Sequence, residues 1–399
     1  MKLNKLTRIL QIFFNPLYIL AIPIILLIRV FRPFIKIRFG TLHSEIFGIF
    51  AINPELILCN KEAGIDQPKH KTIDIWYFGS KISNTQLALM WKRVFFVLPF
   101  WLIRPLLLAN KYIPGGMNHL VEKLNGRDFH NLFDRYPVHI NFSEEEELYG
   151  MLELEKMGIT AGAKFVTILA RDSVYTREKE PDRDWSYHDY RNTDVNSYVK
   201  AAQFLVNAGY FVIRMGSKVK DKFEFQNKNV IDYATNGTRS DFMDIYLGAK
   251  CEFCITMGSG WDSIPFIFRK PIVYVNLVPI GYIYSYSTRY ITISKKYFSI
   301  PDNRELTLKE IVSRNLHNFF ESSQYINNGI KLIENTPEEI YDVVIEMFQR
   351  LNGNWESQPE DDQLQKIFWM RIPKGDKVHG EFKGRYGAAY LRKNVWWLS

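Results

Sequence analysis

The first strong pattern along the chain is an apolar run at residues 9–28 that contains no charged side chain. Its length matches the roughly 20 residues that a helix needs to cross a hydrocarbon layer. The run is followed by arginines and not by the small-residue cleavage site of a signal peptide. Residues 1–33 are therefore predicted to be a retained membrane anchor. Pro16 and Pro23 would kink a spanning helix, which leaves a segment lying within one leaflet as the alternative.

After this run, short apolar segments alternate with helical patterns, which is typical of an α/β protein with a doubly wound, mostly parallel sheet. Two strands that end in glycine are predicted at 34–40 and 72–79. Five more are predicted in the second half of the chain, at 163–173, 210–217, 229–234, 251–260 and 270–276. Ser143, followed by four glutamates, marks the start of a helix that joins two domains.

These patterns divide the chain into four predicted parts. They are a membrane anchor (1–33), an N-terminal domain (34–155), a C-terminal domain (156–350) and a tail (351–399). Residues 95–109 of the N-terminal domain are apolar and aromatic, with basic residues around them. We interpret this stretch either as a core helix or as a patch that faces the membrane.

The composition is that of a globular chain of 399 residues, with 47% hydrophobic and 24% charged residues. A net charge of +8 favours an anionic partner: nucleic acid, an anionic membrane or a phosphorylated substrate. The three cysteines, Cys59, Cys251 and Cys254, form no disulfide framework and indicate a reducing compartment. Because residues three apart on a strand point to opposite faces, we interpret the last two as buried thiols.

The candidate chemistry lies where the predicted strands end. In open parallel sheets a ligand binds beyond the carboxyl ends of the strands, where a following helix offers free N–H groups to an anion. Gly258, Ser259 and Gly260 occupy such an end, and Arg171 and Arg214 end two other strands at the same edge. Together they predict a cradle for a pyrophosphate. The fingerprints GxGxxG and GxxxxGK[ST] are absent, which argues against a dehydrogenase and a P-loop ATPase.

Other candidates surround this cradle. Residues 177–194 are a polar insertion, interpreted as a lid over the donor or as a solvated loop. The additional binding candidates are Asp172, Arg191, Gly216, Asp262 and Ser263. For the last two the alternative is a helix cap, since Asp and Ser are common at helix starts.

The block at 164–276, with "ARDSVY", "YRNTD", "FVIRMGS", "SDFMDIYLGA" and "ITMGSGWDSIP", resembles the glycosyltransferases of bacterial surface-polysaccharide gene clusters. The resemblance also takes in "RFGTLHSEIFGIFAINPE" and "GEFKGRYGAAYLRKNVWWL", so it covers most of the chain. It implies the GT-B fold, in which an acceptor domain and a nucleotide-sugar domain, both Rossmann-like, face a cleft. It also implies catalysis without a metal or other cofactor, because a helix N-terminus and basic side chains neutralise the diphosphate.

Sugar transfer needs a base for the acceptor hydroxyl and a group that stabilises the leaving nucleotide. His43 and Glu45 occupy the first strand-to-helix loop, which faces the cleft in this architecture. Where the family carries a basic residue near position 45 followed by Gly-His, this chain has Glu45 and "FGIF". The sequence therefore leaves the base open between His43 and Glu45.

The expected function is metal-independent transfer of a sugar from a nucleotide-sugar to a surface glycan, with a lipid-linked acceptor, at the cytoplasmic face of the bacterial inner membrane. The alternatives are a nucleotide-sugar 2-epimerase-like enzyme and a non-catalytic polysaccharide-assembly protein of the same fold. The tail, with Trp396 and Trp397, is expected to pack back on the N-terminal domain. Nucleic acid is not an expected partner, because the aromatic residues are not interleaved on one sheet.

Overall fold

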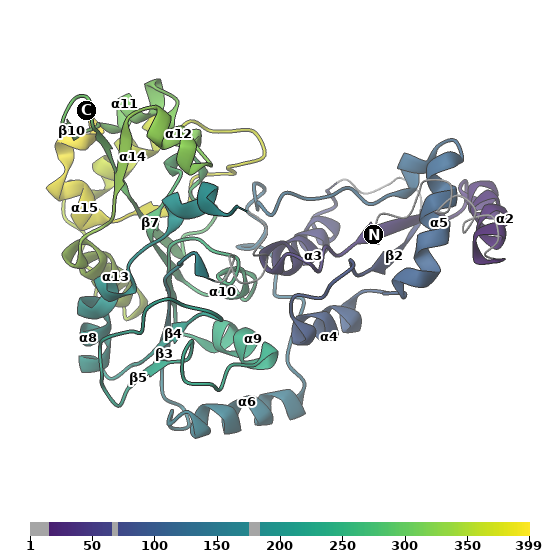
Figure 1. Ribbon diagram of the computed structural model, residues 1–399, viewed down its shortest axis with the longest axis horizontal. Helices are drawn as coiled ribbons and strands as arrows, with labels where there is room; N and C mark the ends of the chain where they lie inside the picture. The colour runs from purple at the N-terminus through teal and green to yellow at the C-terminus, as the bar shows by residue number, and fades with distance from the viewer. Residues whose placement is uncertain (1–15, 66–70, 175–183) are drawn as a thin grey trace. The chain divides into compact units, whose positions relative to one another are not determined.

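The computed structural model describes residues 16–65, 71–174 and 184–399 (Figure 1). The chain forms two compact units. Unit 1 extends to Gly126 and includes His139–Asn141, and unit 2 comprises Arg127–Val138 and Phe142–Ser399. The helix predicted after Ser143 is α6 (Glu144–Lys156), and the predicted cap is confirmed, because the Ser143 hydroxyl accepts a hydrogen bond from the N–H of Glu146. The sequence analysis placed this helix at the end of the N-terminal domain, whereas the structure places it in unit 2.

Unit 1 is built on two parallel strands, β1 (Lys36–Thr41) and β2 (Thr72–Tyr77), connected by α3 (Phe47–Glu62). Parallel bridges from Leu120 to β1 and from Val97 to β2 widen this sheet on both sides. The other helices of unit 1 are α2 (Pro16–Phe31), α4 (Thr85–Val94) and α5 (Phe100–Tyr112). Among the described residues, unit 1 is therefore a small parallel α/β layer and lacks the longer sheet of a complete Rossmann-like domain.

Helix α2 packs along α5 at one end of unit 1 (Figure 1). Ile25 and Ile28 of α2 are buried in one hydrophobic cluster with Phe39 of β1 and Ile103 of α5. Residues 1–15 of the predicted anchor lie outside the described part of the chain. Within that part, no helix combines the length and the apolar character needed to cross a membrane.

Unit 2 contains a seven-stranded parallel sheet in the order β12-β8-β7-β6-β3-β4-β5. Its strands are β3 (Phe165–Leu169), β4 (Phe211–Met215), β5 (Val230–Asp232), β6 (Cys254–Thr256), β7 (Ile272–Leu277), β8 (Tyr290–Ser294) and β12 (Arg385–Tyr386). Counted from β3, the first six strands follow the doubly wound order 3-2-1-4-5-6. The order reverses between β3 and β6, so a crevice for ligand is expected at the carboxyl ends of these two strands.

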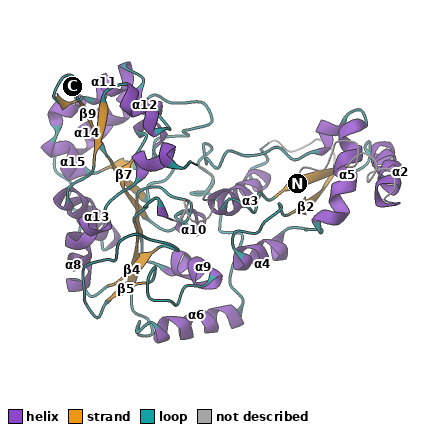
Figure 2. Cartoon of the chain, in the orientation of Figure 1, coloured by secondary structure: helices purple, strands orange, loops and turns teal. Residues whose placement is uncertain are grey.

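Helices cover both faces of this sheet, as Figure 2 shows. The α-helices after α6 within the described residues are α8 (Val199–Asn207), α9 (Asp241–Lys250), α10 (Ser263–Ile267), α11 (Leu308–Ser313), α12 (Ser322–Asn327), α13 (Pro337–Leu351), α14 (Asp361–Arg371) and α15 (Ala388–Lys393). A separate antiparallel sheet is formed by β9 (Lys296–Ser299), β10 (Arg304–Glu305) and β11 (Ile330–Ile333). The five strands predicted for this half are present, and the sequence analysis missed β8 and β12, which extend the sheet at one edge.

The C-terminal tail belongs to unit 2. Its strand β12 pairs with β8, and Trp397 is buried against Phe368 and Tyr386, with ring centroids 6.0 and 5.5 Å away. The sequence analysis expected the tail to pack on the N-terminal domain. That expectation stays a prediction, whereas within unit 2 the Tyr386 hydroxyl accepts the main-chain N–H of Ser294 and so fixes the tail to the end of β8.

The CxxC pair is confirmed as two buried thiols. Cys251 precedes β6 and Cys254 begins it, and both are free and buried. Burial raises the pKa of the Cys251 thiol to about 11, which keeps the sulfur protonated and unreactive.

Candidate functional site

The Gly-Ser-Gly turn lies directly after β6, and a buried carboxylate holds its shape. Oδ2 of Asp262 accepts the Ser259 N–H at 2.7 Å and the Thr256 hydroxyl at 3.1 Å. Gly258 has a φ of +83°, and a Cβ there would lie 2.7 Å from the Leu277 side chain, so only glycine fits without strain. The turn is therefore fixed in advance of any ligand.

The residues after the turn are buried. Asp262 and Ser263 are each 3% exposed, and burial raises the pKa of Asp262 to about 7. Asp262 occupies the N-cap position of the next helix, but its side chain makes no cap hydrogen bond to that helix and instead holds the preceding turn, so its contact with a ligand stays a prediction. Helix α10 spans only Ser263–Ile267, so an anion here would be held by the turn and by side chains more than by a helix dipole.

Arg171 follows β3, on the other side of the point where the strand order reverses. Its Nη1 donates to Oδ1 of Asn192 at 2.7 Å and to the His188 carbonyl at 3.0 Å. Burial, and then the charge of Arg191, lower the pKa of Arg171 to about 10. The guanidinium groups of Arg171 and Arg191 are partly desolvated and repel one another. Because an anion bound near such a pair stabilises both charges, this pair favours a negatively charged ligand.

Arg191 connects the two strand ends. It ends a 3₁₀ helix at Ser186–Arg191, and its guanidinium donates to the Gly258 carbonyl. The segment that the sequence analysis interpreted as a lid therefore contacts the turn through its described part. Residues 177–183 of that segment lie outside the described residues. The structure thus brings together Arg171, Arg191 and the Gly-Ser-Gly turn.

Lys295 is a further cation at this edge that the sequence analysis missed. It follows β8, is only 5% exposed, and its Nζ donates to the Asn192 carbonyl at 2.5 Å. Glu334 lies 3.6 Å from the same Nζ. Burial lowers the pKa of Lys295, and the charge of Arg171 contributes in the same direction. A lysine directly after an apolar strand is the sequence signal that could have identified Lys295. It was missed because β8 was not predicted.

Buried amides hold the backbone around these cations. At the end of β7, Asn276 and Asn335 exchange two hydrogen bonds of 2.6 Å through their side chains and main-chain N–H groups. The Asn276 amide also donates to the Thr193 hydroxyl at 2.9 Å, and this hydroxyl donates to Glu334 at 2.9 Å. Such a connected buried network positions the loop that carries Arg191.

Arg214 is not part of this group. Its guanidinium, 1% exposed, lies 3.1 Å from the Asp232 carboxylate of β5 and donates to the Asp221 carbonyl. Its charge is therefore matched by a carboxylate, as the charge of Lys295 is by Glu334, and the role of Arg214 in the predicted cradle stays a prediction. A sequence does not reveal which neighbouring strand supplies such a counter-charge.

Two further candidates shape the loop between β4 and β5. The Asp172 carboxylate accepts the main-chain N–H groups of Val174 and Lys220, at 2.9 and 2.7 Å. At Gly216 a Cβ would lie 2.8 Å from the Val219 side chain. Both residues therefore have structural contacts that explain their type, and their binding roles stay predictions.

Unit 1 has a cavity of about 190 Å³ at the carboxyl ends of its strands. Thr41 and Tyr77, the last residues of β1 and β2, line it, and the Thr41 hydroxyl donates to the Tyr77 hydroxyl. His43, Glu122 and Lys123 also line it. This is the position at which parallel α/β layers bind ligands.

The cavity separates the two base candidates. His43 lines it, and burial followed by the charge of Lys123 lowers the pKa of the imidazole, which keeps it neutral at neutral pH. The Glu45 carboxylate instead accepts the Ser80 N–H at 2.7 Å and the Ser80 hydroxyl at 3.3 Å. His43 thus lines the cavity and Glu45 is engaged with Ser80, and the choice of base between them stays a prediction.

One group among the described residues has the composition of a metal site. Glu55 and Cys59 of α3 lie with His139 so that their ligand atoms are within 4.8 Å of one another. The imidazole nitrogens of His139 lie 3.1 Å from Glu55 and 3.3 Å from Glu62, and the hydrogen bond to Glu55 raises the pKa of His139. An imidazolium between two carboxylates accounts for this arrangement without a metal ion.

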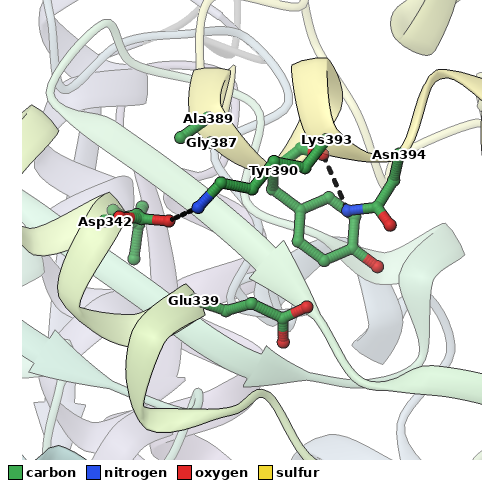
Figure 3. A pocket seen from close by; sticks show the side chains of 8 residues that line it. Glu339, Asp342, Gly387, Ala389, Tyr390, Lys393 and Asn394 are labelled. Carbon is green, nitrogen blue, oxygen red and sulfur yellow. Dashed lines mark hydrogen bonds and ion pairs between the residues drawn. The ribbon is translucent and has the colours of Figure 1, made fainter.

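A smaller hollow of about 10 Å³ lies between α13 and α15 (Figure 3). Lys393 and Asp342 form an ion pair of 2.5 Å at its wall, and the Asn394 amide donates to the Tyr390 carbonyl. This volume holds at most one water molecule, so it is no candidate for a substrate site.

No known protein family and no curated protein matches the sequence. Among solved structures, the ADP-heptose LPS heptosyltransferase II of E. coli is 14% identical, with 64% of this chain and 90% of that chain covered and a TM-score of 0.39. A glycosyl transferase family 9 protein from Veillonella parvula is 11% identical, with 78% and 96% covered and a TM-score of 0.43. An E. coli heptosyltransferase solved with ADP-2-deoxy-2-fluoro heptose is 10% identical, with 69% and 99% covered and a TM-score of 0.31. All three scores lie below 0.5, so the functional argument rests on the strand order and the site residues alone.

Proposed function

We propose that this protein is a GT-B glycosyltransferase that moves a sugar from a nucleotide-sugar to a surface-glycan acceptor without a metal ion. One observation carries the proposal. Arg171, Arg191 and Lys295 gather beside a preformed Gly-Ser-Gly turn at the reversal point of a doubly wound sheet. That is the position where such sheets bind nucleotides, and the cations have the charge that a diphosphate needs.

In the proposed reaction the acceptor hydroxyl oxygen forms a bond to the anomeric carbon of the donor sugar. The bond from that carbon to the diphosphate oxygen breaks, and the nucleoside diphosphate leaves with the electron pair. Arg171 and Arg191 stabilise the charge that develops on the diphosphate. The neutral imidazole of His43 accepts the proton of the acceptor hydroxyl.

The test is a panel of nucleoside diphosphates and nucleotide-sugars, with binding measured by thermal shift and calorimetry. We expect nucleoside diphosphates to bind and the corresponding nucleosides, which lack the phosphates, to bind far more weakly. Equal binding of nucleoside and nucleoside diphosphate would contradict the site. Incubation of the bound nucleotide-sugar without an acceptor then separates the alternatives, because a 2-epimerase converts its substrate alone, whereas a transferase needs an acceptor. A protein that binds and converts nothing would be an assembly protein.

A further inference from the structure

The surface of α2 that faces away from α5 is apolar and exposed. The exposed large apolar residues of this helix are Leu17, Ile19, Leu20, Ile22, Ile24, Leu26, Leu27, Val30 and Phe31. Phe34 after the helix and Phe100 and Trp101 of the neighbouring helix α5 are exposed as well, with Trp101 62% exposed. So many exposed large apolar residues on two packed helices mark an interaction site. We call these residues of α2 and α5, together with Phe34, the apolar face.

The charged side chains of α2 and α5 have one sign. No aspartate or glutamate occurs in 16–44 or 99–121, the segments that contain these two helices. The exposed basic residues of these segments are Arg32, which follows α2, and Arg104 and Lys111 of α5. An apolar surface with basic residues and without acidic ones is complementary to a membrane with anionic headgroups.

The geometry distinguishes lying in a leaflet from crossing the bilayer. The described part of α2, Pro16–Phe31, is not exposed on all sides, as a lone helix that crosses a bilayer would be. The helix also packs along α5 through Ala21, Ile25 and Ile28, so one side of it is already covered by protein. A helix covered on one side and apolar on the other is suited to a position at the membrane surface.

We propose that α2 and α5 dock unit 1 onto one leaflet of an anionic bilayer through the apolar face. The cavity of unit 1 lies close behind this surface. Phe39, Tyr77 and Leu120 line the cavity, and the same three residues pack in the hydrophobic cluster formed by α2 and α5. Docking would therefore hold the cavity next to the headgroup layer, where it would receive the head of a lipid-linked acceptor. This last step rests on the proposed function, whereas the docking itself does not.

The first experiment is co-sedimentation of the full chain with vesicles of phosphatidylcholine, with and without phosphatidylglycerol. We expect binding to the anionic vesicles, and loss of most of it in the double variant Ile22→Glu with Leu26→Glu. The control is Ile326→Glu, because Ile326 is 71% exposed on α12 of unit 2 and should not contribute. Binding of the double variant at the wild-type level, or equal loss in the control, would overturn the proposal.

A second experiment tests charge and depth. Arg104→Glu should weaken binding to anionic vesicles at low salt, whereas Lys309→Glu on α11 should not. Lipids brominated along the acyl chain should quench the fluorescence of Trp101. The quenching seen in the wild type but not in Trp101→Phe is the part that comes from this residue. Equal quenching in both proteins would place Trp101 in water and contradict the docking.

A third experiment separates the membrane from a second copy of the chain. If the apolar face were a dimer interface, light scattering in solution would give twice the chain mass and vesicles would not bind. That result would overturn the proposal. All vesicle experiments are done without nucleotide, so loss of membrane binding with intact nucleotide affinity rejects the docking and leaves the proposed function standing. The opposite pattern rejects the proposed function alone.

Discussion

The carboxylate of Asp262 accepts the main-chain N–H of Ser259 at 2.7 Å and thereby closes the Gly-Ser-Gly turn from the inside. Burial raises the pKa of this carboxyl from 3.8 to about 7, so the folded state holds the proton over a range in which the unfolded chain has lost it. The stabilisation that Asp262 provides is therefore full below the unfolded pKa and is lost as the pH rises through the folded pKa.

We expect Asp262→Asn to remove this pH dependence, because an amide oxygen can still accept the Ser259 N–H but does not ionise. Urea unfolding at about pH 4.5 and at about pH 8 measures the effect as the difference between wild type and variant. The variant should gain stability relative to wild type at the higher pH. A constant difference across this range would show that Asp262 is charged throughout.

Arg171→Ala should weaken the binding of a nucleoside diphosphate by about 1.5–3 kcal/mol, because a charged hydrogen bond to phosphate is lost. Titration calorimetry on the folded variant measures the change. Arg304→Ala is the matched control, since Arg304 is an exposed arginine of unit 2 that pairs with Glu310. Unchanged affinity in the Arg171 variant would remove this residue from the site.

Arg214→Met should act on stability and not on nucleotide affinity. It leaves Asp232 without its buried partner, and breaking such a pair costs about 3 kcal/mol. Chemical denaturation gives the stability, and calorimetry below the unfolding transition gives the affinity. A stable variant with reduced affinity would restore Arg214 to the cradle.

His43→Asn should lower the rate of sugar transfer by about 100-fold or more, the range for a lost general base. The wild-type rate should fall as the pH drops through the pKa of His43, which is below its usual value, because the protonated imidazole cannot accept a proton. Glu45→Gln should change the rate much less, since Glu45 is engaged with Ser80. If Glu45→Gln shows the larger loss, the assignments are reversed.

Transfer activity should persist in EDTA, because the three cations replace a metal ion at the diphosphate. Glu55, Cys59 and His139 provide the control. If EDTA lowers activity in the wild type and not in Cys59→Ala, the metal acts at this cluster of unit 1. Loss in both proteins, restored by Mg²⁺ or Mn²⁺, would contradict metal-independent transfer.

The sequence by itself determined the local elements. Alternating apolar runs and helical patterns located β3, β4, β5, β6 and β7, because strand and helix periods are set by neighbouring residues. The cap at Ser143, the buried thiols and the placement of Arg171 and the Gly-Ser-Gly turn at strand ends were predicted for the same reason. All of these depend on residues close together along the chain.

Only the tertiary structure decided which of these ends meet. That β3 lies beside β6, that Asp232 neutralises Arg214, and that Lys295 reaches Asn192 all depend on contacts between residues far apart in the sequence. The same holds for the packing of α2 along α5, which covers one side of an apolar run that the sequence alone presents as uniformly hydrophobic. Local periodicity carries no record of strand order or of partners across the fold, and the charge and exposure of a side chain are set by those partners.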